Sequence, residues 1–221
     1  LQEMHRDPDR EVPGESGEDM NVLRSANPAP IAAELGPARP TWSHLVRDLA
    51  ALLTRLRPRT IVAPHPLLDR DADHGMAALA VFDAIAASGA EGFALWLYTN
   101  HATFAERFPF GAPAGVMGIP PWFDGAAPFH GVVSRGLDEE TRLLKLFALD
   151  AMHDLRRGPP GPEAGFGGDL RVAAAALKNG LARRSGLSLD YFWRAARPNE
   201  LFFTYRPEDV ARIRVAFLRR G

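Results

Sequence analysis

The sequence predicts an α/β fold, a Rossmann-like doubly wound domain with a mostly parallel sheet and helices on both faces. Two short apolar runs, residues 60–63 and 93–98, are rich in β-branched and aromatic side chains, as strands are. Between them, residues 73–88 place apolar side chains at helical spacing and stop at Gly89, a residue type typical of helix ends. A strand, a helix and a strand in this order predict a right-handed crossover between parallel strands. Because residues 93–98 are apolar on both faces, we expect helices to cover both faces of the sheet.

Further elements are predicted on both sides of this unit. Residues 41–56 repeat apolar side chains at three- and four-residue steps and end before Pro58, which indicates an amphipathic helix. A long loop rich in Phe, Pro and Gly follows residue 98, and its length predicts a wall or lid over a functional site. The later pattern predicts a strand at 129–134, helices at 138–155 and 169–184, a strand at 201–205 and a basic terminal helix at 207–220.

Length and charge favour one domain preceded by a polar segment. The chain has 221 residues, 46% of them hydrophobic, which is enough to bury a substantial core. Residues 1–40 begin with many acidic residues, so we assign a flexible acidic segment there and one domain to residues 41–221. The net charge of −1 gives no general attraction to nucleic acid or to an anionic membrane. No run reaches the about 20 apolar residues of a membrane span, so we expect a soluble, cytoplasmic protein.

The side chains that can carry chemistry gather directly after the first predicted strand. They are two histidines and three aspartates: His65, Asp69, Asp71, Asp73 and His74. In an open α/β sheet such a loop lies at the carboxyl end of the strand, where ligands bind. The chain has no cysteine, so a metal here would need histidine and carboxylate ligands, a set that suits zinc or a similar divalent ion. No glycine-rich phosphate loop follows either strand, which disfavours a nucleotide-binding domain.

Two short motifs frame this loop, and three later stretches accompany them. Pro64-His65-Pro66 ends the strand, and Asp71-Ala72-Asp73-His74 opens the helix. The later stretches are Tyr98-Thr99-Asn100-His101, Pro120-Pro121-Trp122-Phe123 and Arg197-Pro198-Asn199-Glu200-Leu201-Phe202-Phe203. Together they resemble the PIG-L/LmbE-like deacetylases, in which a strand ends in Pro-His-Pro and His-Pro-Asp-His opens a helix. Members of that family are metal-dependent hydrolases that remove N-acetyl groups from amino sugars and related glycoconjugates.

The resemblance implies a zinc-dependent hydrolase that removes an N-acetyl group from an amino sugar or a glycoconjugate. His74 would be a metal ligand, and Asp73 would orient neighbouring groups. Either His65 or Asp71 would stand where the partner of the oxyanion belongs. A zinc ion in such a site lowers the pKa of its bound water to about 7 and polarises an amide carbonyl, while a nearby carboxylate takes the proton.

Each of these side chains also has a structural interpretation. The aspartates and His74 stand where a helix is capped, and there they would interact with its first backbone amides. His65 is either part of the chemistry or a buried, hydrogen-bonded loop histidine. The strand-end pair Asn100 and His101 would bind the substrate, or would only satisfy backbone groups of the loop.

Two departures separate this chain from the family pattern. The family's first motif, His-Pro-Asp-Asp-Glu, supplies two metal ligands and the general base, and it is absent from these 221 residues. Because the chain begins at Leu1 rather than Met, we expect an upstream segment or a second chain to supply that motif and complete the site. Asp71 and Ala72 replace the family's His-Pro, and an ionised carboxylate does not stabilise an oxyanion. The alternative function is therefore a non-catalytic relative that binds a carbohydrate or a partner.

Overall fold

The computed structural model describes residues 1–13, 20–26, 33–100, 102, 108–109, 115–120, 129–150 and 195–220. The chain divides into two compact units, the first made of residues 1–104, 124–131 and 203–221 and the second of residues 105–123 and 132–202. The described helices and strands are α1 (Gln2–Arg6), α2 (Met20–Ala26), α4 (Trp42–Leu56), β1 (Thr60–Pro64), α5 (Ala72–Ser88), β2 (Ala94–Tyr98), β3 (Gly131–Gly136), α6 (Glu139–Asp150), β4 (Asn199–Tyr205), the short 3-10 helix η2 (Pro207–Asp209) and α9 (Val210–Leu218).

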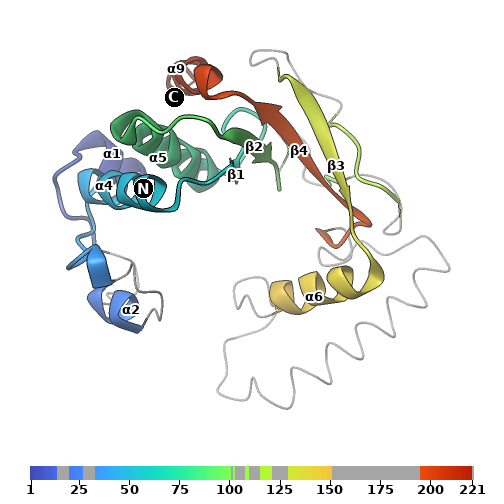
Figure 1. Ribbon diagram of the computed structural model, residues 1–221, viewed down its shortest axis with the longest axis horizontal. Coiled ribbons are helices and arrows are strands. Elements are labelled where there is room, and N and C mark those ends of the chain that lie inside the picture. The colour runs from blue at the N-terminus through green and yellow to red at the C-terminus, as the bar shows by residue number, and fades with distance from the viewer. Residues whose placement is uncertain are drawn as a thin grey trace. The chain divides into compact units, whose positions relative to one another are not determined.

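The fold is mixed α/β, and its described strands form one four-stranded sheet in the order β1-β2-β4-β3 (Figure 1). β1 and β2 are parallel, with Ile61 opposite Leu95, as the sequence predicted. β4 is antiparallel to β2, with Phe203 opposite Leu97. The described sheet is therefore mixed, where the sequence led us to expect a mostly parallel one. Alternating burial in β4 identifies a strand but carries no information on its direction. The antiparallel pairing of β4 could therefore not be predicted from its own residues.

Helices α4 and α5 begin and end where the sequence predicted. Thr41 caps α4, because its hydroxyl accepts a hydrogen bond from the His44 amide at 3.1 Å. Asp71 caps α5 in the same way. Gly89 ends α5 with a φ of 61°, a left-handed conformation that glycine adopts without strain. These local signals determine where the helix before β1 and the helix after it begin and end.

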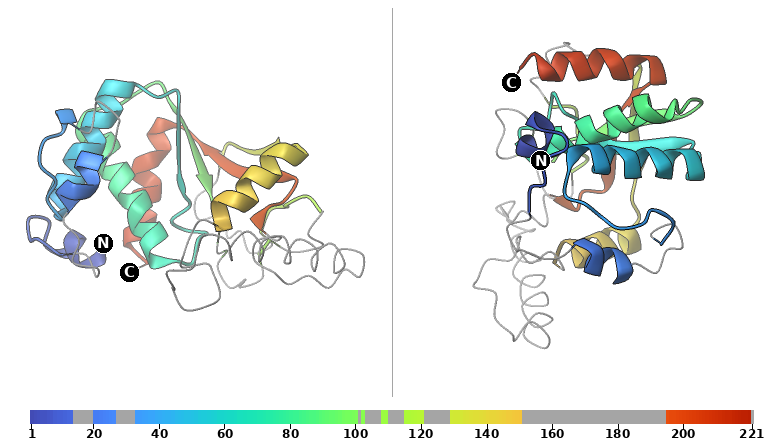
Figure 2. Two further views of the ribbon diagram at one scale, coloured as in Figure 1. Left: turned by 90° about the horizontal axis from the view of Figure 1, so that it is seen from below. Right: turned by 90° about the vertical axis from the view of Figure 1, so that its left-hand side faces the viewer.

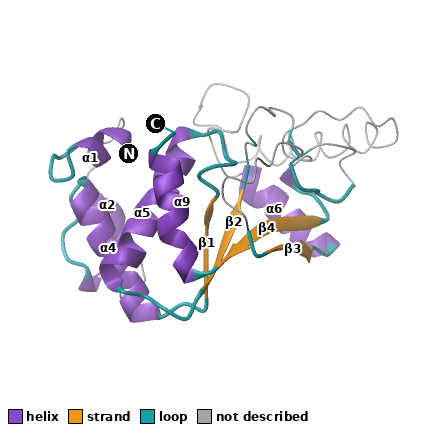
Figure 3. Cartoon of the chain, turned by 90° about the horizontal axis from the view of Figure 1, so that it is seen from above, coloured by secondary structure: helices purple, strands orange, loops and turns teal. Residues whose placement is uncertain are grey.

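A hydrophobic cluster of the first unit lies between these two helices. Trp42 on α4 packs with Met76, Leu79 and Ala80 on α5. α4, α5 and α9 run side by side (Figure 2), and α5 lies next to β1 (Figure 3). Burial of these apolar side chains is the main stabilising contribution in this unit.

Helix α9 fixes the position of α5 and of the loop that precedes it. The Asp83 carboxylate on α5 accepts a hydrogen bond from Trp42 Nε1 at 3.0 Å and from Arg214 Nε at 2.6 Å. Phe217 packs against Gly75 so closely that a Cβ there would lie 2.8 Å from its ring. Arg220 donates to the carbonyl oxygen of Leu67 at 2.8 Å. The C-terminal helix therefore supports the loop that carries the candidate site.

The acidic N-terminal segment contains two short helices, α1 and α2, where the sequence predicted a loop. Its backbone is tied to the rest of the unit: the Ser43 amide donates to the Pro8 carbonyl and the Val12 amide donates to the Pro40 carbonyl, both at 2.9 Å. These long-range contacts stabilise conformations that composition alone does not predict.

The later elements agree with the sequence in type and differ at their ends. The strand predicted at 129–134 is β3, the helix predicted from residue 138 is α6, the strand predicted at 201–205 is β4, and the terminal helix is η2 followed by α9. The helix predicted at 169–184 and the residues Trp122 and Phe123 of the expected lid lie outside the described residues.

In the second unit, two buried side chains at the start of β4 bind the chain around residues 109–117. Arg197, which is fully buried, donates to the carbonyl oxygens of Pro109 at 2.7 Å and Gly115 at 3.3 Å. The side-chain amide of Asn199 accepts from the Met117 amide at 2.6 Å and donates to the Met117 carbonyl at 3.1 Å. These bonds fix the described part of the long loop to the sheet.

We predict that Asp83→Ala lowers the free energy of unfolding by about 1–3 kcal/mol, because the Trp42 indole and the Arg214 guanidinium both lose their acceptor. Chemical denaturation of the full chain measures this change. The matched control is Glu208→Ala, which removes a carboxylate from an exposed ion pair with Arg206 at 3.7 Å, and we expect a change within about 0.5 kcal/mol there. Equal effects of the two substitutions would contradict the role assigned to Asp83.

Candidate functional site

The candidate site lies in the first unit, after the carboxyl ends of the parallel strands β1 and β2. The His65 amide donates to the Tyr98 carbonyl at 2.6 Å and so continues the ladder by one residue. The chain then turns, and the amides of Leu68 and Asp69 donate back to the His65 carbonyl at 3.2 and 2.8 Å. This turn places the aspartates and His74 between the end of β1 and the first turn of α5.

The Asp69 carboxylate is the centre of the polar contacts. Its side chain is 0% exposed. One oxygen, Oδ2, accepts from the Asn100 amide at 2.8 Å and from the Thr99 hydroxyl at 3.4 Å. The other, Oδ1, accepts from the Asp71 amide at 3.1 Å and lies 3.0 Å from Nδ1 of His74. One buried carboxylate therefore joins the ends of both strands to the start of α5.

His74 lies in the first turn of α5 with its side chain 31% exposed. Because a carboxylate accepts, the contact with Asp69 places a proton on Nδ1, and Nε2 of the neutral ring then carries the lone pair. Histidines that bind metals commonly donate their other ring N–H to a carboxylate in this way. The arrangement suits a metal ligand or a proton acceptor at Nε2.

The described residues alone do not complete a zinc site. His74 supplies one imidazole, already oriented by Asp69. Within the described residues, no group of three or more His, Cys, Asp or Glu side chains is arranged to hold a metal ion. A catalytic zinc normally has three protein ligands, so further ligands would have to come from elsewhere.

Asp71 lies where the structural interpretation placed it, at the cap of α5, and Asp73 follows it. The Asp71 side chain accepts from the amides of Asp73 at 2.8 Å and His74 at 3.2 Å, which makes it the N-cap of α5. Asp73 is exposed. The carboxylate that orients His74 is that of Asp69, not that of Asp73. Asp69 belongs to the cluster that the sequence predicted, but its role as the partner of His74 was not predicted. That contact depends on how the turn brings residue 69 back to residue 74.

His65 is buried and fully hydrogen-bonded. Its Nδ1 accepts from the amides of Leu67 and Leu68, each at 3.2 Å. Nδ1 is thus an acceptor, and Nε2 of the neutral ring donates to the Tyr205 hydroxyl at 2.8 Å. The Phe203 ring packs edge-on against the imidazole. These contacts match the structural interpretation, a loop histidine that shapes the turn after β1.

Tyr205 was missed at the sequence level. It ends β4, on the face where every second residue is buried. Burial raises the pKa of Tyr205, so its hydroxyl stays protonated and available to His65. Alternation along residues 199–205 indicated an inward side chain, but only the antiparallel pairing of β4 with β2 brings it to His65.

The proposed substrate-binding pair has one described member. Asn100 contributes its backbone amide to Asp69, while the residue itself is exposed. This contact corresponds to the interpretation in which the strand end satisfies loop groups. His101 lies outside the described residues.

Comparisons with protein-family models, curated proteins and solved structures give no match to this chain. In the part of the chain that the structure describes, no helix has the length and apolar character needed to cross a membrane.

We predict that Asp69→Asn changes the tautomer of His74. Each oxygen of Asp69 accepts from two donors, and asparagine would replace one of these oxygens with an NH₂ group. In either orientation of the amide, that NH₂ group would face two donors and could not accept from them. We expect a loss of about 1–3 kcal/mol in the free energy of unfolding and a smaller fraction of His74 rings protonated at Nδ1.

The nitrogen NMR shifts of labelled histidine rings report the tautomer directly. The control is Asp73→Asn, since Asp73 is exposed and is not the carboxylate bound to His74. An unchanged His74 tautomer in Asp69→Asn would show that Asp69 does not orient the ring.

Proposed function

We propose that this chain is a deacetylase domain of the PIG-L/LmbE type, a metal-dependent amide hydrolase that acts on an N-acetylated amino sugar or glycoconjugate. The observation that carries the proposal is the contact between His74 Nδ1 and the buried Asp69 carboxylate at 3.0 Å. This contact fixes the ring of a partly exposed histidine at the start of a helix and leaves the lone pair of the neutral ring on Nε2.

The position of this pair agrees with a ligand site. It follows the carboxyl ends of two parallel strands, where ligands bind in open α/β sheets. Three donors besides His74, from Asp71, Thr99 and Asn100, hold the Asp69 carboxylate in place, so the imidazole is oriented before any ligand arrives. Orientation of this kind is what a metal ligand or a general base requires.

In this proposal His74 is one ligand of zinc or a similar divalent ion. The remaining ligands and the general base come from residues outside the described part of the chain or from a second chain. β1 is an edge strand of the described sheet, so another strand could extend the sheet beside it toward a Rossmann-like, doubly wound arrangement. The partners proposed are an N-acetylated sugar and the segment or chain that completes the site.

A second candidate function is a non-catalytic relative that binds a carbohydrate or a partner. The observation that favours it is Asp71, whose carboxylate caps α5 at the position where the resemblance places an oxyanion-stabilising histidine. A negative charge at that position opposes the developing charge of an amide hydrolysis transition state.

We predict that His74→Ala, made in the protein together with the segment or chain that completes the site, lowers zinc affinity by about tenfold or more and abolishes acetate release from N-acetylglucosamine. Zinc titration and acetate assay measure the two effects. The matched control is His130→Ala, because His130 is also a partly exposed histidine bound to a carboxylate, that of Asp209 at 2.8 Å. Equal zinc affinity in the two variants would remove His74 from the ligands, and glycan binding without zinc or acetate release would support the second candidate.

We predict that Asp71→Asn raises the rate of deacetylation by about tenfold, because it removes the opposing charge and offers an amide donor. Asparagine is as good an N-cap as aspartate, so α5 keeps its start. The comparison variant is Asp71→Ala, which removes the same charge and also the cap. A rate that does not rise in Asp71→Asn, measured as acetate release at saturating zinc, would contradict a place for residue 71 beside the oxyanion.

A further inference from the structure

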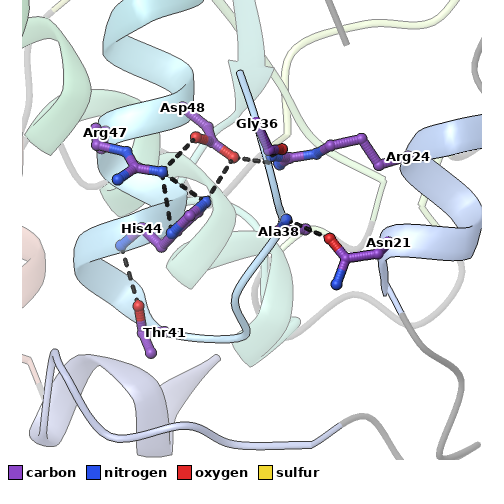
Figure 4. A network of polar contacts seen from close by, with 8 residues as sticks. All are labelled: Asn21, Arg24, Gly36, Ala38, Thr41, His44, Arg47 and Asp48. Atoms are coloured by element: carbon purple, nitrogen blue, oxygen red, sulfur yellow. Dashed lines mark hydrogen bonds and ion pairs between the residues drawn. The ribbon is translucent and has the colours of Figure 1, made fainter. Parts of the chain in front are cut away.

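A second polar network lies in the first unit and joins helix α2 to helix α4 (Figure 4). Its residues precede β1 in the chain and are separate from the candidate site at residues 65–74. The Arg24 guanidinium donates to the Gly36 carbonyl at 2.6 Å and forms a close ion pair with Asp48. The Asn21 side chain accepts from the Ala38 amide at 2.6 Å. Two side chains of α2 thus hold residues 36–38 and the middle of α4.

The described part of α2 relies on these polar contacts. The helix has seven residues, too few to be stable alone in water. Two of its apolar side chains, Met20 and Val22, are 45% and 65% exposed, so the burial of these two adds little support. Asp48, by contrast, is buried, and its pair with Arg24 is shielded from water. Loss of the Arg24 contact would therefore remove a large part of what keeps α2 in place.

His44 lies beside this pair and shares its carboxylate. The imidazole is buried, and its Nε2 is 3.5 Å from Oδ2 of Asp48, the oxygen that Arg24 contacts. Arg47 reaches the ring as well, at 2.8 Å from Nε2 and 3.1 Å from Nδ1. Because arginine only donates, this contact requires a ring nitrogen with a lone pair, and hence a neutral His44.

The surrounding charges also favour the neutral ring. Burial lowers the pKa of His44 from its ordinary value of 6.5; Asp48 opposes that shift, and the guanidiniums of Arg47, Arg24 and Arg39 add to it. Arg39 is itself paired with Glu11 at 2.9 Å. One carboxylate, Asp48, therefore stands among several positive charges.

We propose that α2 and residues 33–40 form a strap that is latched to α4 through Arg24 and Asp48, and that protonation of His44 opens the latch. A protonated ring no longer accepts from Arg47, and it adds a third positive charge around Asp48. The imidazolium then competes with Arg24 for the same carboxylate oxygen. Because α2 is short and is held to α4 through this carboxylate, its release relieves the repulsion and uncovers the His44 face of α4.

The direction of the pH dependence follows from linkage. A histidine whose pKa is lower in the closed state binds a proton more readily in the open state. The closed strap is therefore most stable above the ordinary histidine pKa, and it loses stability as the pH falls from there toward the lowered value. This inference is independent of the proposed deacetylase function.

Hydrogen exchange of the full chain at a pH of about 7.5 and about 5.5, expressed as protection factors, tests the latch. We expect the protection of the Ala38 amide and of the α2 amides to fall about tenfold at the lower pH, while amides in α5 keep theirs. His44→Gln, which stays neutral, should keep the strap closed at both values. Arg24→Ala should open it at both values.

The matched control is Arg55→Ala, since Arg55 forms an exposed ion pair with Glu34 at 3.6 Å and its loss should leave the strap closed at the higher pH. The latch is refuted by any of three results: Ala38 protection independent of pH, the same pH dependence in His44→Gln, or an undiminished protection in Arg24→Ala. Loss of protection in α5 together with α2 would show general acid unfolding and would also overturn it.

Discussion

The buried Asp69 carboxylate needs hydrogen-bond partners on both oxygens, and this requirement organises the first unit around the candidate site. A buried carboxylate without partners would be strongly destabilising, and here the residues after β2 and at the start of α5 present donors to this one side chain. His74 obtains its orientation as a result. The turn after His65 is tightly bonded, and a shift of residue 69 would break contacts both to the start of α5 and to the residues after β2.

Local signals predicted the elements around the site well. The Thr41 cap, the Gly89 terminator and the apolar strands β1 and β2 all act within a few residues, so the order of helix, strand, helix and strand was readable from the sequence. The parallel pairing of β1 with β2 followed from that order and is confirmed. The cluster of histidines and aspartates was also placed correctly, after β1 and at the start of α5.

The remaining features depend on contacts between distant residues. The direction of β4 is not encoded in its alternation, and without it the contact of Tyr205 with His65 had no basis. Asp69 and Asp73 look equivalent in sequence, and only the turn distinguishes the carboxylate that reaches His74. Helix α2 depends on an ion pair between Arg24 and Asp48, which periodicity cannot reveal.

The order in which α9 follows the elements that it supports has a consequence for assembly during synthesis. α4, β1, α5 and β2 leave the ribosome long before α9 does. Until then Asp83 has only Trp42 as a partner, the ring of Phe217 does not cover Gly75, and the Leu67 carbonyl has no guanidinium from Arg220. A nascent chain would therefore hold the loop of the candidate site loosely, and the geometry around His74 would become fixed only after α9 has been synthesised and has packed against α5.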